Sequence, residues 1–159
     1  MTSATSVVAR AIATAGGAGY ARYAPGTWGT AVAAVLTFTV LAPLSAAAFW
    51  AVCVITIGGG IWAAGEADRA WGTHDSGRIV IDEVAGFFIT VAPVPDKRSL
   101  WWLLAAFVVF RALDILKPPP VRWIDRHVPG GAGVVLDDVA AGILGAVIMI
   151  ILGAFCGWS

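Results

Sequence analysis

Two stretches of the chain repeat one pattern of acids. The sequence IDEVAG carries Asp82 and Glu83, and LDDVAAG carries Asp137 and Asp138; each pair is followed by Val-Ala, a glycine and an apolar run. Four clustered carboxylates cannot all stay ionised without a cation, and hard oxygen ligands suit Mg²⁺ or Mn²⁺. The repeat therefore predicts a divalent-metal site between two helices. A simpler alternative is that the acids cap two helix N-termini.

Charged residues gather again between these two acid pairs. Arg111, Asp114 and Lys117 follow one another at intervals of three residues, so neighbouring members can share one face of a helix. Three prolines at 118–120 end that helix and leave Lys117 near its C-terminal end. Cations that alternate with acids suit a phosphate site next to a metal.

A further group of charges follows the prolines. Arg122 and Arg126 lie one helical turn apart with Asp125 between them. This spacing predicts a short helix that either adds to the phosphate site or is a salt-bridged amphipathic helix at a membrane surface. The loop PGGAG at 129–133 offers flexible backbone amides directly before the second acid pair.

The stretch APGTWGT precedes a charge-free helix. Small residues with exposed amides at a helix N-terminus bind anions, which makes Gly26 and Thr27 candidates for phosphate binding. An ordinary turn in which Thr27 or Thr30 is the N-cap explains the stretch equally well.

The sequence lacks the residues that several classes of reaction require. The sequence contains no cysteine in a polar setting, no G-x-S-x-G, no Walker lysine motif and no D-x-D-x-T. His74 and His127 neighbour acids, and each is either a proton shuttle or a surface residue. The route that remains is metal-assisted attack of water on phosphorus.

Composition places these residues in a membrane protein. Of the 159 residues, 59% are hydrophobic and 13% are charged, against about 25% charged in a typical soluble domain. The mean hydropathy is +0.85. The net charge is zero, so no nucleic-acid partner is expected. Cys53 and Cys156 lie in apolar runs and are interpreted as small hydrophobic residues.

The apolar runs predict an all-α fold. No charge falls between Tyr23 and Gly65; Pro43 divides this run into a short segment, 30–42, and a spanning one, 45–64, with Ser45 as its N-cap. The segment 139–158 is also long enough to cross. The shorter runs 84–93 and 100–110 are expected to be buried, re-entrant or near-spanning. Gly86 and Gly142 would let their helices approach closely.

One domain is therefore expected over residues 1–159. It would hold about four spanning or near-spanning helices, with three as an alternative, and short interfacial helices. The N-terminus shows no secretory signal and is expected to form a short amphipathic helix that ends at Gly16-Gly17. Residues 66–69 are interpreted as part of a solvated loop.

The motifs PGTWGT, HDSGRIVIDEVAG, FRALDILKPPPVRWIDR and GGAGVVLDDVAAG, in this order, resemble the phosphatidylglycerophosphatase A family from about Pro25 to Gly142. The resemblance implies a small helical membrane enzyme of bacteria. Such an enzyme removes the terminal phosphate of phosphatidylglycerophosphate with Mg²⁺, which gives phosphatidylglycerol and inorganic phosphate. The chain departs from the family pattern at PPP, where a larger residue is expected between two prolines.

The resemblance and the residue patterns described above together assign the site residues. The residues expected to be catalytic are Asp82, Glu83, Asp114, Lys117, Asp137 and Asp138. The expected Mg²⁺ ligands are Asp75, which matches the acid ahead of the IVIDE element, with Asp82, Glu83, Asp114, Asp137 and Asp138. The expected phosphate-binding residues are Lys117, Arg111, Arg122, Thr27 and Gly26. A metal-activated water is expected to attack, with Glu83 or Asp138 as the base.

The partners are then a phospholipid substrate and the bacterial inner membrane, crossed several times. The basic residues beside the acids put the site on the cytoplasmic side by the positive-inside rule. The sequence 96–98, Asp-Lys-Arg, conflicts with this rule, because its loop should lie on the opposite side if the run 84–93 crosses the membrane; the alternative is that the short runs are re-entrant. The alternative function is a small ion-coupled transporter with a carboxylate cation site. A non-catalytic scaffold would leave the paired acids unexplained, and oligomeric state stays open.

Overall fold

The computed structural model describes residues 4–158 and contains no strand within that range. In chain order the elements are α1 (Ala4–Ala13), the 3₁₀ segment η1 (Ala15–Tyr20), α2 (Pro25–Leu36), the π-helical turn η2 (Thr37–Leu41), α3 (Ala46–Trp71), α4 (Ile81–Val91), α5 (Leu100–Leu116), α6 (Pro119–His127) and α7 (Gly130–Cys156). The all-α prediction is confirmed.

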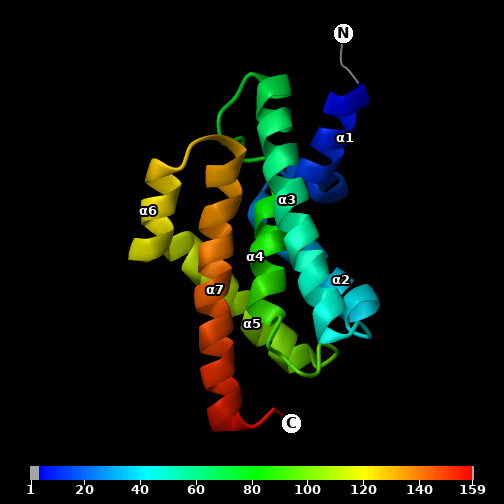
Figure 1. Ribbon diagram of the computed structural model, residues 1–159, viewed down its shortest axis with the longest axis vertical. Helices are drawn as coiled ribbons and strands as arrows, with labels where there is room; N and C mark the ends of the chain where they lie inside the picture. The colour runs from blue at the N-terminus through cyan, green and yellow to red at the C-terminus, as the bar shows by residue number, and fades with distance from the viewer. Residues whose placement is uncertain (1–3, 159) are drawn as a thin grey trace.

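Two long antiparallel helices, α3 and α7, form the frame of the molecule (Figure 1). They have 26 and 27 residues and are apolar enough to cross a membrane. At about 1.5 Å per residue each is about 40 Å long, which exceeds the hydrocarbon core of a bilayer. The other apolar helices are shorter. The structure thus supports two spans by length and composition, and the predicted number of four is not confirmed.

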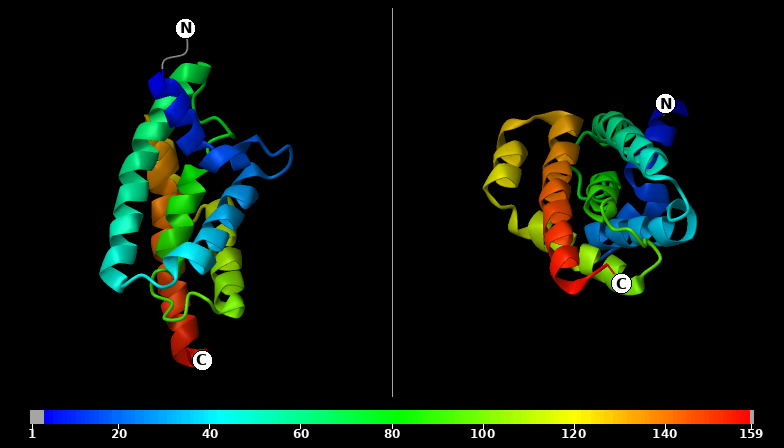
Figure 2. Two further views of the ribbon diagram at one scale, coloured as in Figure 1. Left: turned by 90° about the vertical axis from the view of Figure 1, so that its right-hand side faces the viewer. Right: turned by 60° about the horizontal axis from the view of Figure 1, so that its bottom comes forward.

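The short helix α4 lies at the centre of the bundle, surrounded by α2, α3, α5 and α7 (Figure 2, right). Every residue from Val84 to Val91 is buried. Its sequence is apolar on all sides instead of along one stripe, which is the pattern of a fully enclosed helix. The run 84–93 is therefore buried over residues 84–91, in agreement with one of the sequence-based alternatives.

The connection between α4 and α5 lies at the end of the bundle opposite to the connection between α3 and α4 (Figure 1). This connection holds Lys97 and Arg98. The two short helices together lead the chain across the bundle and back. The charges at 96–98 thus lie away from both acid pairs.

Several predicted helix ends are confirmed. The Ser45 side chain accepts a hydrogen bond from the Ala48 backbone N–H at 3.3 Å and caps α3. Helix α1 ends at Ala13, shortly before Gly16 and Gly17, whose φ angles of +70° and +110° suit glycine. The prolines end α5 at Leu116.

Other ends differ from the prediction. Helix α5 extends beyond the apolar run 100–110 to Leu116, because the Arg111 side chain faces acids inside the protein. Residues 66–69 belong to the last turns of α3 and not to a loop. The glycines of PGGAG do not form a loop either: α7 begins at Gly130, and Asp137 and Asp138 lie two turns inside it. A Cβ on Gly131 would lie 2.3 Å from the Ile61 carbonyl oxygen of α3, so this glycine allows close helix packing.

Candidate active site

A pocket of about 250 Å³ opens where the ends of several elements meet. It is lined by the start of α2, the loop between α3 and α4, the first turn of α4, the end of α5, and parts of α6 and α7. Its ionisable lining residues are His74, Asp75, Asp82, Glu83, Asp114, Lys117, Asp125, Asp137 and Asp138. Seven acids and one lysine make this pocket strongly acidic.

Three of the acids form the tightest cluster. One oxygen each from Asp82, Glu83 and Asp138 lies within 4.8 Å of the others. Asp82 and Glu83 occupy the first turn of α4, where the helix dipole favours anions, and Asp138 reaches them from α7. Among the described residues, one oxygen of each carboxylate is buried without a hydrogen-bond partner: Asp82 Oδ1, Glu83 Oε2 and Asp138 Oδ2. Buried oxygens of this kind could hold a cation.

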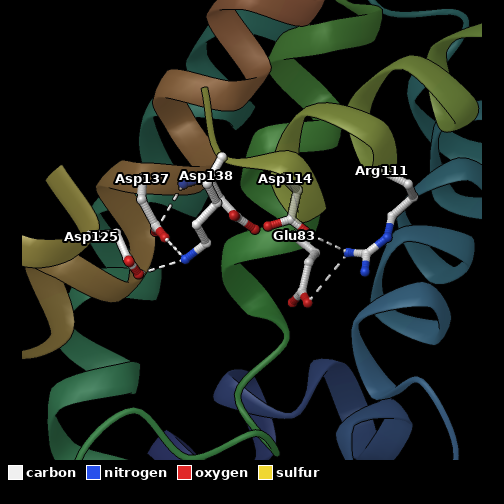
Figure 3. Close-up of polar contacts among 7 residues, drawn as sticks. Glu83, Arg111, Asp114, Asp125, Asp137 and Asp138 are labelled. Atoms are coloured by element: carbon white, nitrogen blue, oxygen red, sulfur yellow. Dashed lines mark hydrogen bonds and ion pairs between the residues drawn. The ribbon is translucent and has the colours of Figure 1, made fainter. Parts of the chain in front are cut away.

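Lys117 connects three elements beside this cluster. Its Nζ lies 2.5 Å from Asp125 Oδ1 of α6 and 2.7 Å from Asp137 Oδ2 of α7 (Figure 3). The lysine follows α5 and has a left-handed backbone with φ of +42°, which turns the chain toward α6. Burial alone would lower the pKa of the ammonium, but the hydrogen bonds and charges of the two carboxylates outweigh it and raise the pKa.

Arg111 forms ion pairs with two acids and does not line the pocket. Its Nη1 lies 2.7 Å from Asp114 Oδ2 and 3.6 Å from Glu83 Oε1 (Figure 3). The predicted face shared by Arg111 and Asp114 is thus present. Arg122 is exposed, and its Nη2 donates a hydrogen bond to the Leu116 carbonyl oxygen at 3.2 Å. Neither arginine is placed to bind an anion in the pocket.

The start of α2 meets Glu83. A Cβ built on Gly26 would lie 1.9 Å from Glu83 Oε1, so a larger residue would displace the Glu83 carboxylate. Thr27 is exposed and outside the pocket lining, and the Thr30 hydroxyl donates to the Gly26 carbonyl oxygen at 2.9 Å. The N-cap position is Ala24, so neither threonine is the N-cap. Of the five expected phosphate-binding residues, Lys117 and Gly26 line the pocket.

The six expected metal ligands all line the pocket, but they divide by partner. Asp82, Glu83 and Asp138 form the cluster. Asp137 is engaged, because Oδ2 binds Lys117 and Oδ1 accepts from the Asp138 backbone N–H at 2.9 Å. Asp114 pairs with Arg111 and points toward Asp138 (Figure 3). Asp75 is exposed at the mouth, with a left-handed φ of +55°.

Sequence reasoning missed Asp68. This buried carboxylate of α3 accepts hydrogen bonds from the Thr73 hydroxyl at 2.9 Å and from the backbone N–H groups of Asp75 and Ser76 at 2.7 and 3.1 Å. It fixes the loop that carries His74 and Asp75 to the pocket. The available signal was Gly72, which ends α3 in a left-handed conformation and turns the following Thr-His-Asp-Ser back toward the helix.

The sequence is similar to known proteins. A family model described as phosphatidylglycerophosphatase A matches residues 11–153. Proteins named phosphatidylglycerophosphatase A are 36% identical in Escherichia coli (strain K12), over 86% of this chain and 78% of the relative, and 37% identical in Haemophilus influenzae, over 84% and 81%. A Bacteroides thetaiotaomicron protein named "Putative phosphatidylinositol-3-phosphatase" is 40% identical over 83% of this chain and 85% of its own. No solved structure matches the chain.

Proposed function

The chain belongs to the phosphatidylglycerophosphatase A family of lipid phosphatases, and from this premise we propose that it hydrolyses the terminal phosphomonoester of phosphatidylglycerophosphate with Mg²⁺ in the acidic pocket. The products are phosphatidylglycerol and inorganic phosphate. The observation that supports this best is the cluster of Asp82, Glu83 and Asp138, with three buried oxygens that lack hydrogen-bond partners among the described residues.

These donors fit a hard divalent cation. They are carboxylate oxygens, the preferred ligands of Mg²⁺, and no histidine or cysteine belongs to the cluster. Asp82, Glu83 and Asp138 would hold the ion, with Asp114 and Asp75 next to it. When bound, Mg²⁺ neutralises phosphate charge and lowers the pKa of a coordinated water. The charge balance supports such a cation, because a phosphate dianion would otherwise enter a pocket of seven acids and one lysine.

Lys117 is the residue of the pocket that would bind phosphate directly. An ammonium group has three N–H donors, and Asp125 and Asp137 occupy two of them. The third can donate to a phosphoryl oxygen. Because both carboxylates fix the position of Nζ, the lysine is preorganised for that contact. The Gly26 backbone lies at the same pocket and leaves room for the Glu83 carboxylate.

Asp114 is the acid best placed to accept a proton from the attacking water. It lines the pocket, lies outside the three-carboxylate cluster, and its Oδ2 lies 2.7 Å from Arg111 Nη1, which holds the carboxylate in place. Glu83 and Asp138, the bases expected from the sequence, are both members of the cluster. Arg111 then acts on Asp114 and Glu83 and not on the phosphate.

The position of the pocket suits a lipid headgroup. It lies near one end of the two candidate spans, so the diacylglycerol tails can stay in lipid while the headgroup enters. Basic residues lie on the segments around it, including Arg78, Lys117 and Arg126. We infer a cytoplasmic orientation in the bacterial inner membrane from this bias.

The test is release of inorganic phosphate from phosphatidylglycerophosphate in detergent micelles, with Mg²⁺, with EDTA, and with Mg²⁺ restored. Release that EDTA abolishes and Mg²⁺ restores is expected. A parallel assay uses phosphatidylinositol 3-phosphate, since one relative is named for that substrate. Faster turnover of the inositol lipid would overturn the substrate assignment while the metal mechanism stands.

A charge-removing variant tests the cluster. Asp138→Asn should lower turnover at least about a hundredfold, because one carboxylate ligand of the proposed Mg²⁺ is lost and the ion then stabilises the transition state less. Glu66→Gln, whose parent acid forms an exposed pair with Arg69, is the matched control and should stay within about twofold. Phosphate release that survives in Asp138→Asn would contradict the cluster as the metal site. Mg²⁺ transport without hydrolysis would favour the transporter alternative.

A further inference from the structure

An apolar groove lies between α2, with its π-helical extension η2, and α5. The two helices α2 and α5 lie on the same side of the bundle (Figure 2, left). Its volume is about 280 Å³, and it is lined by Ala34, Val35, Phe38, Thr39, Leu100, Leu103, Leu104 and Phe107. Thr39 is the sole lining residue with a polar side chain, and its hydroxyl donates to the Val35 carbonyl oxygen at 2.7 Å. The groove therefore offers a dry, apolar surface.

The groove continues one face of α5 that begins in the polar pocket. Asp114, Arg111, Phe107 and Leu104 follow at intervals of three or four residues, so they lie on the same side of the helix. Asp114 lines the pocket, and Phe107 and Leu104 line the groove. Arg111 lies between them and is the last charged side chain before the apolar part.

Helix α2 provides the opposite wall in the same order. Gly26, Thr30, Ala34 and Phe38 are spaced by four residues and also lie on one side. Gly26 lines the pocket, Thr30 is buried, and Ala34 and Phe38 line the groove. Gly26 lies next to Arg111, and Ala34 and Phe38 share the groove with Leu104 and Phe107, so the two stripes change from polar to apolar in the same direction.

The length of this track matches one leaflet of a membrane. Asp114 and Leu104 are ten residues apart, which is about 15 Å along a helix. Half of a hydrocarbon core of about 30 Å is also about 15 Å. A chain that starts at the pocket would thus follow the groove to about the depth that an acyl chain reaches.

We propose that the groove between α2 and α5 binds one acyl chain of the phospholipid whose phosphomonoester occupies the acidic pocket. This inference rests on the proposed lipid phosphatase function and deepens it, because it assigns a second binding site to the same substrate. The acyl chain packs against Phe107, Leu104 and Ala34, while Arg111 marks the boundary with the headgroup. The enzyme thus selects a phosphomonoester attached to a long-chain lipid.

Groove-filling variants test this with two substrates. Ala34→Phe fills the floor and Leu104→Trp narrows the rim, and the exposed position of Leu104 keeps the second variant independent of core packing. For dioleoyl phosphatidylglycerophosphate each should raise KM about tenfold, since even one methylene contact changes selectivity by that order. For the dihexanoyl form, whose chains are too short to reach Leu104, KM should change less than twofold. Val108→Trp, on the same helix at a similarly exposed position outside the groove, is the control.

Photolabelling identifies the occupant without turnover. A phosphatidylglycerophosphate analogue with a diazirine at the acyl terminus should label α5 near Leu104, and a phosphatidylcholine with the same chain should not. Equal labelling by both lipids would show bulk membrane lipid in the groove and overturn the proposal. Labelling that falls as protein concentration rises would show a second copy there, and would overturn it too.

The two proposals fail in different ways. If the wild-type chain releases no phosphate from any lipid, the proposed function fails, whatever the labelling shows. If it hydrolyses both chain lengths and the groove variants slow both equally, the function stands and the acyl-chain site is rejected.

Discussion

Gly86 of α4 and Gly142 of α7 touch backbone to backbone. A Cβ on Gly142 would lie 2.4 Å from the Gly86 carbonyl oxygen, and a Cβ on Gly86 would lie 2.6 Å from the Asp138 carbonyl oxygen. The Thr90 hydroxyl donates to the Gly86 carbonyl at 3.0 Å and lies 3.4 Å from the Gly142 carbonyl. This close approach brings the two acid pairs together, because each glycine follows its pair by three to five residues.

Gly142→Ala should therefore destabilise the fold. The added methyl group meets backbone, which cannot rotate away, so α4 and α7 must separate at a cost of about 1–3 kcal/mol. Thermal unfolding in detergent measures this. Gly58→Ala, where a Cβ meets nothing within 4 Å, should instead be neutral or stabilising by up to about 1 kcal/mol. Equal melting temperatures for the two variants would refute the packing argument.

Gly26→Ala should damage activity more than stability. Its methyl group would displace the Glu83 carboxylate from the cluster, because the Cβ would lie 1.9 Å from Oε1. A displacement of this size can lower turnover about a hundredfold. The measurement is kcat at saturating Mg²⁺, with Gly59→Ala as control because that position has open space. Wild-type turnover in Gly26→Ala would show that catalysis does not depend on the position of the Glu83 carboxylate.

Lys117→Met should destabilise the chain with a characteristic pH dependence. The substitution leaves the buried Asp137 carboxylate without its partner, at a cost of about 1–3 kcal/mol. The pKa of Lys117 is raised in the folded protein, so its contribution is complete below the ordinary lysine pKa of 10.5 and is lost only as pH rises through the raised value. The stability difference from wild type should stay constant between about pH 6 and 9.

The control for that experiment is Arg69→Met. Arg69 forms an exposed pair with Glu66, so its removal should change the free energy of unfolding by less than about 1 kcal/mol. If the stability difference between wild type and Lys117→Met already declines between pH 6 and 9, the two carboxylates do not stabilise the charged form of Lys117.

Asp68→Ala should loosen the loop at 73–76. Three hydrogen bonds to this loop are lost, so the amides of Asp75 and Ser76 should exchange with deuterium faster. KM should rise because His74 and Asp75 lose their fixed position at the pocket. Glu66→Ala, two residues earlier on the same helix, should leave both measurements unchanged. Unchanged exchange at these amides in Asp68→Ala would rule out the anchoring role.

The sequence predicted much of the fold from hydropathy alone. The charge-free runs gave α3 and α7, and Ser45 gave the start of α3, because burial in lipid or core imposes a local composition. The prediction of a loop at 129–133 was wrong for a physical reason. Glycine disfavours helix by its own propensity, but the contact of Gly131 with α3 outweighs that preference, and propensity says nothing about partners.

By itself, then, the sequence determined the class of protein, the acid pairs and their family, since residue type and spacing are local properties. The tertiary structure decided which acids converge, because that depends on how α4 and α7 are positioned by Gly86 and Gly142. It also decided that Arg111 binds Asp114 and Glu83, that Lys117 lies between Asp125 and Asp137, and that Asp68 fixes the pocket loop. Such pairings join residues from different elements, and the order of residues along the chain does not contain the distances between them.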